Sequence, residues 1–260
     1  MTEKSRRVNV VGLEVNLCDY ESAMRRVHEL ANARRGGYIC LATVHMTMEG
    51  QDDADFQRLV NNADLVVPDG KPLSVMQKLL GNENALQVRG PGLMPKLFAY
   101  AEQNNLSVGF YGGKQETLDR LLERLAIEFP RLKVAYSFSP PFRPVSAEED
   151  REIVSAINRS GVQILFVGLG CPKQERWMAQ HREKLTAVML GVGAAFDFYT
   201  ETITEAPVWM QRIGLEWMFR LVQEPRRLWR RYLILNPRFT ALAVLQLAGV
   251  KKFEKNESET

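Results

Sequence analysis

Short apolar runs alternate with amphipathic stretches from residue 38 to residue 190, and this alternation limits the fold more than any other feature of the chain. The apolar runs predict strands at 38–42, 65–68, 108–111, 134–137, 164–167 and 188–190. The stretches between them predict helices at 53–61, 72–80, 92–103, 115–128, 147–160 and 172–181. Repeated strand–helix units build a mostly parallel sheet with helices on both faces, so we expect an α/β fold.

The pattern changes after Phe198, where the strand signals stop. From 206 to 250 the apolar residues recur with helical periodicity, and prolines stand at the expected helix starts, namely Pro207, Pro225 and Pro237. These features predict two or three helices appended to the α/β body. We therefore divide the chain into an α/β body at 1–205, a C-terminal helical appendage at 206–253 and a disordered end at 254–260.

Positive charge is concentrated near the C-terminus. Residues 207–252 contain nine basic and two acidic residues, although the net charge of the whole chain is only +3. This asymmetry favours an anionic partner such as a phospholipid, a nucleotide diphosphate or a nucleic acid, while the small total gives no ground for a general nucleic-acid affinity. Arginines beside Trp, Tyr and Leu on short helices are typical of amphipathic helices at an anionic membrane surface. The alternative is a solvated helical cap whose aromatic residues belong to the core.

Cysteine usage and hydropathy indicate where the protein works. The three cysteines include no CxxC pair, which argues against a disulfide framework and a zinc cluster and fits a reducing, cytoplasmic setting. The first residues form no apolar run of signal-peptide length, and no stretch reaches the ~18 apolar residues that a membrane span needs. We expect neither secretion nor transmembrane anchoring.

Glycines cluster where the predicted strands end. They are Gly70, Gly112, Gly113, Gly168, Gly170, Gly191 and Gly193. Ligands of open α/β sheets bind beyond the carboxyl ends of the strands, where glycine lets backbone N–H groups approach a phosphate. The pattern therefore favours a nucleotide-type ligand. The stretches 168–175 and 191–196 lack the last glycine of GxGxxG, which argues against a nicotinamide dinucleotide.

Asp69 is the strongest candidate for a catalytic base. It lies between Pro68 and Gly70 in a stiff turn at a strand end, where a carboxylate can take a proton from an attacking hydroxyl. The alternative is a turn aspartate that accepts a hydrogen bond from its own backbone. Thr43 and Gln174 can exchange hydrogen bonds with sugar hydroxyls, or can serve as capping and helix-surface residues.

The sequence indicates no metal site. The three histidines lie far apart, and the acidic residues at 52–55 precede a helix, where they cap it and complement its dipole. Without a metal, arginines must hold the charge of a diphosphate. Candidates at helical spacing are Arg220, Arg227, Arg230 and Arg231, although Pro225 interrupts a single helix through them. They form either a clamp over a diphosphate or salt bridges to the acidic body.

Four segments resemble one family of enzymes. PDGKP at 68–72, VGLGCPKQERWM at 167–178, GVGAAFDF at 191–198 and the long block at 206–232 are similar to the WecG/TagA/CpsF glycosyltransferases, glycosyltransferase family 26. The resemblance runs from about Val8 to Tyr232 and implies a Rossmann-like body.

The resemblance also implies an inverting, metal-independent hexosyltransferase that needs no cofactor. Its donor is a UDP-sugar that carries N-acetylmannosamine, its uronic acid or glucose, and its acceptor is a saccharide linked to undecaprenyl diphosphate. The products are bacterial cell-surface polysaccharides. Such an enzyme is cytoplasmic and peripheral on the inner face of the cell membrane, and a homo-oligomer is compatible with it. The alternative function is a non-catalytic or NAD-type nucleotide-binding protein at the membrane surface.

Motif by motif, the resemblance makes Asp69 the general base, places Thr43 and Gln174 in the sugar site and places Arg89 near the substrate. The expected substrate-binding set also contains His45, Gly112, Gly113, Gly193, Asp197, Arg220, Arg227, Arg230 and Arg231. The arginines are expected to complete the site when the appendage meets the membrane. The chain departs from the family pattern at three positions, which are His45 in place of asparagine, Gly92 in place of an acidic residue and Glu205 in place of arginine.

Overall fold

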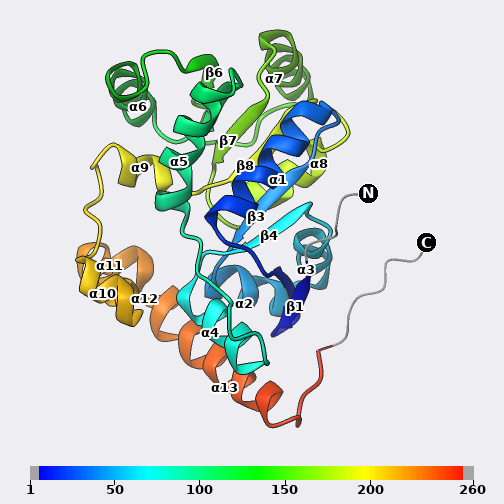
Figure 1. Ribbon diagram of the computed structural model, residues 1–260, viewed down its shortest axis with the longest axis vertical. Helices are drawn as coiled ribbons and strands as arrows, with labels where there is room; N and C mark the ends of the chain where they lie inside the picture. The colour runs from blue at the N-terminus through cyan, green and yellow to red at the C-terminus, as the bar shows by residue number, and fades with distance from the viewer. Residues whose placement is uncertain (1–5, 254–260) are drawn as a thin grey trace.

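A six-stranded parallel sheet forms the centre of the computed structural model, which describes residues 6–253 (Figure 1). The strand order is β4-β3-β8-β7-β5-β6. All six predicted strands are confirmed, at β3 (Tyr38–Ala42), β4 (Leu65–Pro68), β5 (Ser107–Gly112), β6 (Lys133–Phe138), β7 (Ile164–Gly168) and β8 (Val188–Gly191). The predicted disordered end at 254–260 lies outside the described residues.

Helices cover both faces of the sheet, because the central strands are apolar on both sides. On β7, Ile164 and Phe166 enter one core and Leu165 and Val167 enter the other. The first core is closed by α1 (Tyr20–Ala33), α5 (Gly90–Gln103), α6 (Gln115–Glu128) and α9 (Ala195–Tyr199). The second is closed by α2 (Val44–Asp52), α3 (Ala54–Asn61), α4 (Lys71–Leu79), α7 (Ala147–Ser160) and α8 (Lys173–His181). The six predicted helices of the body are confirmed within two residues at their starts.

Five elements of the body were not expected from the sequence, and one of them is the short helix α9. Two others form an antiparallel hairpin of β1 (Arg7–Val10) and β2 (Leu13–Asn16). Its two turn residues, Val11 and Gly12, both have positive φ, and a β-branched residue is a poor signal for such a turn. The remaining two are α1 and α2, and α2 starts directly after β3 with Thr43 as its N-cap.

The C-terminal segment forms four helices, not the two or three expected. They are α10 (Val208–Ile213), α11 (Glu216–Gln223), α12 (Pro225–Leu233) and α13 (Leu235–Leu247). Gly214, with φ +79°, ends α10, and Pro225 begins α12 as its first residue. Pro237 lies inside the first turn of α13. Between residues 6 and 253, no helix is both long and apolar enough to cross a bilayer.

The last helix returns to the body. Phe239 and Ala243 of α13 are buried in the core that α2 helps to close. The Gln246 side chain accepts a hydrogen bond from Val11 N–H (2.9 Å) and donates one to the carbonyl of Asn9 (2.8 Å), which ties α13 to the hairpin. Figure 1 shows α10–α13 together with α2 and α4 at the end of the molecule opposite α6 and α7.

Candidate active site

Asp69 stands where β4 ends and links three segments. Its N–H donates to the carbonyl of Ala42 at the end of β3 (3.0 Å), and its own carbonyl accepts from the Gln87 side chain (2.7 Å). Its Oδ1 accepts from Gly90 N–H at the start of α5 (2.9 Å). The side chain therefore does not serve its own turn. Within residues 6–253, Oδ2 has no hydrogen-bond partner, so this oxygen can receive a proton from a ligand.

The surroundings of Asp69 make it a base of useful strength. Burial raises the pKa of its carboxyl from 3.8 to about 6, and the negative charge of Glu216 acts in the same direction. The hydrogen bond from Gly90 and the charges of Arg89 and Arg231 oppose this shift. A carboxylate with a pKa near 6 is ionised at neutral pH and still binds a proton more strongly than an ordinary aspartate, which suits a general base.

Of the four candidate arginines, Arg231 on α12 acts most directly on this site. Burial dominates the pKa shifts of Asp69, His45 and Glu175, and the positive charge of Arg231 contributes to all three. Arg231 itself is half-buried and leans over the ring of Tyr232. The charge of this guanidinium therefore acts on side chains at the ends of β4, α2 and α8.

The other three arginines occupy different surroundings. Arg220 on α11 is nearly buried, stacks over the ring of Phe198 and bonds to Glu224 (3.1 Å). Arg227 bonds to the same carboxylate (2.5 Å) and is exposed, as is Arg230 beside Trp229. As expected, the four do not share one helix, because Pro225 separates Arg220 from the rest.

The N-terminus of α2 brings Thr43 and His45 beside the site. Thr43 Oγ1 accepts a hydrogen bond from Met46 N–H (3.3 Å), so this residue caps the helix. His45 Nε2 lies 3.1 Å from Glu49 Oε1, whereas its buried Nδ1 has no partner. Burial and the charge of Arg231 lower the pKa of His45 to about 4, so its ring is neutral at physiological pH.

The glycine loops after β5 and β7 lie against each other. Gly113 N–H donates to the carbonyl of Gly168 (3.0 Å). Gly112 has φ +111°, and a Cβ placed there would lie 2.6 Å from the carbonyl carbon of Gly168. Only glycine fits such a close approach of two backbones. Nearby on α9, Asp197 accepts a hydrogen bond from Thr117 at the start of α6 (3.2 Å).

Gln174 joins the loops that follow β7 and β8. It is buried, and its Oε1 accepts from both Gly170 N–H (3.1 Å) and Gly193 N–H (3.0 Å). Its Nε2 donates to Glu175 Oε1 (2.7 Å). The residue is thus neither on the helix surface nor open to a sugar in this structure, and it fixes the spacing of two glycine loops. Burial raises the pKa of Glu175 to about 7.

The acidic residues at 52–55 have structural partners. Asp53 caps α3 through Phe56 N–H (2.9 Å) and pairs with Arg176 (2.6 Å), as the capping interpretation predicted. Asp52 pairs with Arg238 and Asp55 with Arg58. Across the described part of the chain, no group of three or more His, Cys, Asp or Glu side chains is arranged to hold a metal ion.

Comparison with known proteins identifies the class of enzyme to which this arrangement belongs. The model of the "Glycosyl transferase WecG/TagA/CpsF family" matches residues 8–252, nearly the whole chain. The chain belongs to this family. The interpretation as a glycosyltransferase is thereby confirmed, and the alternative of an NAD-type or non-catalytic protein loses its basis.

Two relatives of the WecG/TagA/CpsF chain carry the same printed name, "N-acetylglucosaminyldiphosphoundecaprenol N-acetyl-beta-D-mannosaminyltransferase". The protein of Bacillus spizizenii is 29% identical over 218 residues, which cover 84% of this chain and 82% of the relative. The protein of Bacillus subtilis is 29% identical over 219 residues, with the same coverage. Both names describe transfer of a hexosamine to a saccharide on a lipid diphosphate.

Two of the three departures from the family pattern lie around Arg89. Its guanidinium bonds to Gln211 (2.5 Å), Glu205 (3.1 Å) and Glu216 (2.9 Å), so the acidic residue at 205 has a partner on the body. This network joins the start of α5 to α10 and α11. Gly92 leaves room for a tyrosine, because a Cβ there would lie 2.6 Å from the hydroxyl of Tyr20, which accepts a hydrogen bond from Arg89 N–H.

Sequence reasoning on this WecG/TagA/CpsF chain missed Glu216, Glu175 and Tyr20. Glu216 opens an apolar helix, where an acid is the ordinary dipole partner, and nothing in the sequence signals its contact with Arg89. The sequence gives only a weak signal for Glu175, which is a charged residue between two apolar strands. The structure buries it fully, and charged residues are rarely buried without a role. Tyr20 lies on the unexpected helix α1.

Proposed function

We propose that this protein transfers a sugar from a UDP donor to a saccharide linked to undecaprenyl diphosphate, with inversion at the anomeric carbon and without a metal. Its membership of the WecG/TagA/CpsF family and the printed names of its relatives support the lipid-linked acceptor. The same names favour N-acetylmannosamine as the transferred sugar over its uronic acid or glucose.

Asp69 carries the proposal, because its raised pKa and its unpaired Oδ2 suit a general base. In the proposed reaction, Oδ2 takes the proton of the acceptor hydroxyl as the oxygen attacks the anomeric carbon. The bond between that carbon and the UDP oxygen breaks in the same displacement, and UDP leaves with the electron pair. A single attack from the opposite face inverts the anomeric centre.

Backbone amides and arginines would hold the charge that develops on UDP. The glycine loops after β5, β7 and β8 lie at the carboxyl edge of the sheet, and the charge of Arg231 acts on Asp69, His45 and Glu175 at the ends of β4, α2 and α8. Oriented N–H groups and guanidinium groups stabilise a leaving diphosphate without a metal. Gly112, Gly113, Gly193 and Asp197 are the proposed donor-site residues, with Arg220, Arg227 and Arg230 as further cations.

We also place the enzyme on the inner face of the cell membrane. The C-terminal helices expose large apolar side chains next to arginines, among them Trp209, Ile213, Trp229 and Ile234. This combination binds anionic lipid surfaces through buried apolar area and charge together. Vesicles containing phosphatidylglycerol should therefore sediment the wild type, whereas a Trp209→Ser, Trp229→Ser variant should stay in solution. Phe142→Ser, a control at a 90% exposed aromatic on the body, should not change sedimentation.

The reaction is tested by UDP release from a panel of UDP-sugars, with and without N-acetylglucosamine on a short-chain lipid diphosphate. We expect release from one donor only when the acceptor is present, and the same rate in EDTA and in magnesium. Asp69→Asn should lower the rate on the order of 10²–10⁴-fold. Asp55→Asn, which removes a carboxylate from the surface of α3, serves as the control. Full turnover by a folded Asp69→Asn protein would refute the assignment of the base.

A further inference from the structure

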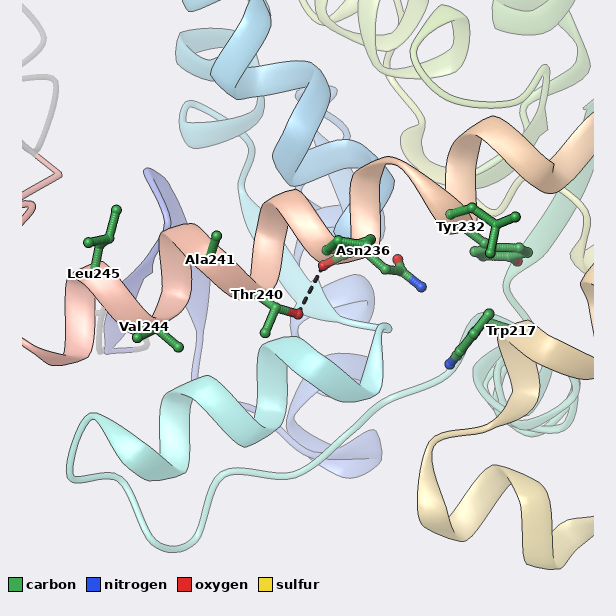
Figure 2. Close-up of a pocket in the computed structure, with 9 residues that line it drawn as sticks. Trp217, Tyr232, Asn236, Thr240, Ala241, Val244 and Leu245 are labelled. Atoms are coloured by element: carbon green, nitrogen blue, oxygen red, sulfur yellow. Dashed lines mark hydrogen bonds between the residues drawn. The ribbon is translucent and has the colours of Figure 1, made fainter.

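An apolar groove lies on the C-terminal helices, beside the candidate active site. It has a volume of about 770 Å³. Its walls come from α11, α12 and α13, and the lining residues are Trp217, Tyr232, Leu233, Asn236, Pro237, Thr240, Ala241, Val244 and Leu245. Figure 2 shows Trp217 and Tyr232 at one end of the groove and Val244 and Leu245 at the other. A cavity of this size holds a drug-sized apolar ligand.

Most residues along the groove are apolar or aromatic, and one of its polar groups is engaged with the protein. Thr240 Oγ1 donates to the carbonyl of Asn236 (2.9 Å), one turn earlier on the same helix (Figure 2). The rings of Trp217 and Tyr232 lie 5.9 Å apart. The walls therefore present hydrocarbon and aromatic surface, which suits an extended apolar chain better than a sugar or a nucleotide.

The groove begins where the charged site ends. Glu216, whose charge acts on Asp69, directly precedes Trp217 in the chain. Arg231, whose charge also acts on Asp69, directly precedes Tyr232. Two helices thus each carry, at adjacent positions, a charged residue whose charge acts on the base and an aromatic residue that lines the groove. The Arg231 guanidinium lies over the Tyr232 ring, 5.7 Å from its centroid. A ligand with a diphosphate at Arg231 would enter the aromatic end of the groove with whatever is bonded to that diphosphate.

We propose that the groove binds the isoprene units nearest the diphosphate of the polyprenyl acceptor. This inference rests on the proposed function, which supplies a ligand with a saccharide, a diphosphate and an isoprenoid chain in that order. The order of surfaces on the protein is the same: Asp69, then Arg231, then the apolar groove. Binding the first isoprene units would hold the saccharide next to Asp69. Only this short part of the lipid would need to leave the bilayer.

The test compares two acceptors that differ only in the chain on the diphosphate. N-acetylglucosamine is linked to farnesyl diphosphate in one and to methyl diphosphate in the other, with UDP-N-acetylmannosamine as donor and no vesicles present. Ala241→Trp fills the groove, and Ala248→Trp adds the same bulk to an exposed position at the end of the same helix, outside the groove. Circular dichroism checks that both variants fold.

We expect the wild type to use the farnesyl acceptor at least tenfold more efficiently, measured as kcat/KM. Ala241→Trp should remove most of this preference and leave the methyl acceptor unchanged, while Ala248→Trp should change neither. An unaltered preference in Ala241→Trp would overturn the inference. The inference would also be overturned if Ala241→Trp kept the preference for the farnesyl acceptor but no longer sedimented with vesicles, because the groove would then be a contact with the bilayer. Loss of a dimer alone, measured for Ala241→Trp by analytical ultracentrifugation, would overturn it in the same way.

A binding measurement separates this inference from the proposed reaction. Trp217 lines the groove, so its fluorescence should change when farnesyl diphosphate binds and should not change with methyl diphosphate. If the wild type transfers sugar to neither acceptor but binds farnesyl diphosphate in a manner that Ala241→Trp abolishes, the proposed reaction is wrong and the prenyl site stands. If farnesyl diphosphate binds equally well to the wild type and to Ala241→Trp, the prenyl site is wrong.

Discussion

Replacing Asp69 by asparagine is expected to stop catalysis and, at the same time, to stabilise the fold. Asparagine keeps the shape of the side chain and an oxygen that can accept the hydrogen bond from Gly90 N–H, but it removes the negative charge. Burial raises the pKa of Asp69 from 3.8 to about 6, which means that the folded protein disfavours the ionised carboxylate relative to water. An uncharged amide avoids this cost.

The size and the pH dependence of the gain follow from the pKa shift. The difference between 3.8 and about 6 corresponds to about 3 kcal/mol, and partial contact with water reduces the expected gain to about 1–2 kcal/mol. Between these pH values the folded protein holds a proton that the unfolded chain has released. The unfolding free energy of the wild type therefore falls as pH rises through about 6, and the advantage of the variant shrinks as pH is lowered from about 8 to about 4.

Thermal unfolding followed by circular dichroism at several pH values measures this advantage. At about pH 8 the melting temperature of Asp69→Asn should exceed that of the wild type by about 2–8 °C. Asp53→Asn is the control, because the hydrogen bond from Phe56 N–H and the partner Arg176 lower the pKa of that carboxyl, so its removal should not stabilise the protein. A variant at position 69 that is less stable than the wild type at about pH 8, or whose gain is independent of pH, would contradict the reasoning.

Three further predictions concern the base, the glycine loops and the last helix. Glu216→Gln should move the acid limb of the pH profile of kcat/KM to a pH below its wild-type position near 6. The reason is that the charge of Glu216 adds to burial in raising the pKa of Asp69. An acid limb at the wild-type pH would exclude this coupling. Gly112→Ala should lower the unfolding free energy by about 2 kcal/mol or more, since its Cβ would meet the backbone of β7, whereas Gly81→Ala, with positive φ and open space, should cost less. Gln246→Ala should cost about 1–3 kcal/mol and raise hydrogen exchange in the β1–β2 hairpin; unchanged exchange there would show that α13 does not hold the hairpin.

The strands of the body could be predicted because each is a short apolar run whose two faces both meet helices. Ile164 to Val167 carries no polar residue, and the structure buries all four side chains. The hairpin could not be predicted in the same way. Its turn uses Val11 where turn chemistry favours Asn, Asp or Gly, and its position depends on contacts with α13, more than two hundred residues away.

Asp69 could be singled out as a candidate base because the signal is local, a carboxylate in a Pro-Asp-Gly turn at a strand end. The role of Gln174 could not, because its two backbone partners come from loops after different strands. The network around Arg89 also joins segments that lie more than one hundred residues apart. Pattern reading finds residues whose role is set by their neighbours in the chain, and it misses residues whose role is set by the fold.

The C-terminal helices form a strap, by which we mean a segment that is attached to the body at both ends, rather than a lid hinged at one end. The strap leaves the body after α9 and is fastened again by α13 on α2 and the hairpin. Its middle is attached as well, because Arg89 of the body bonds to Gln211 of α10 and to Glu216 of α11. Cutting the chain at Pro207 would therefore also uncover the site of Phe239 in the core, so a loss of activity on truncation would report on the integrity of the body as much as on the missing arginines.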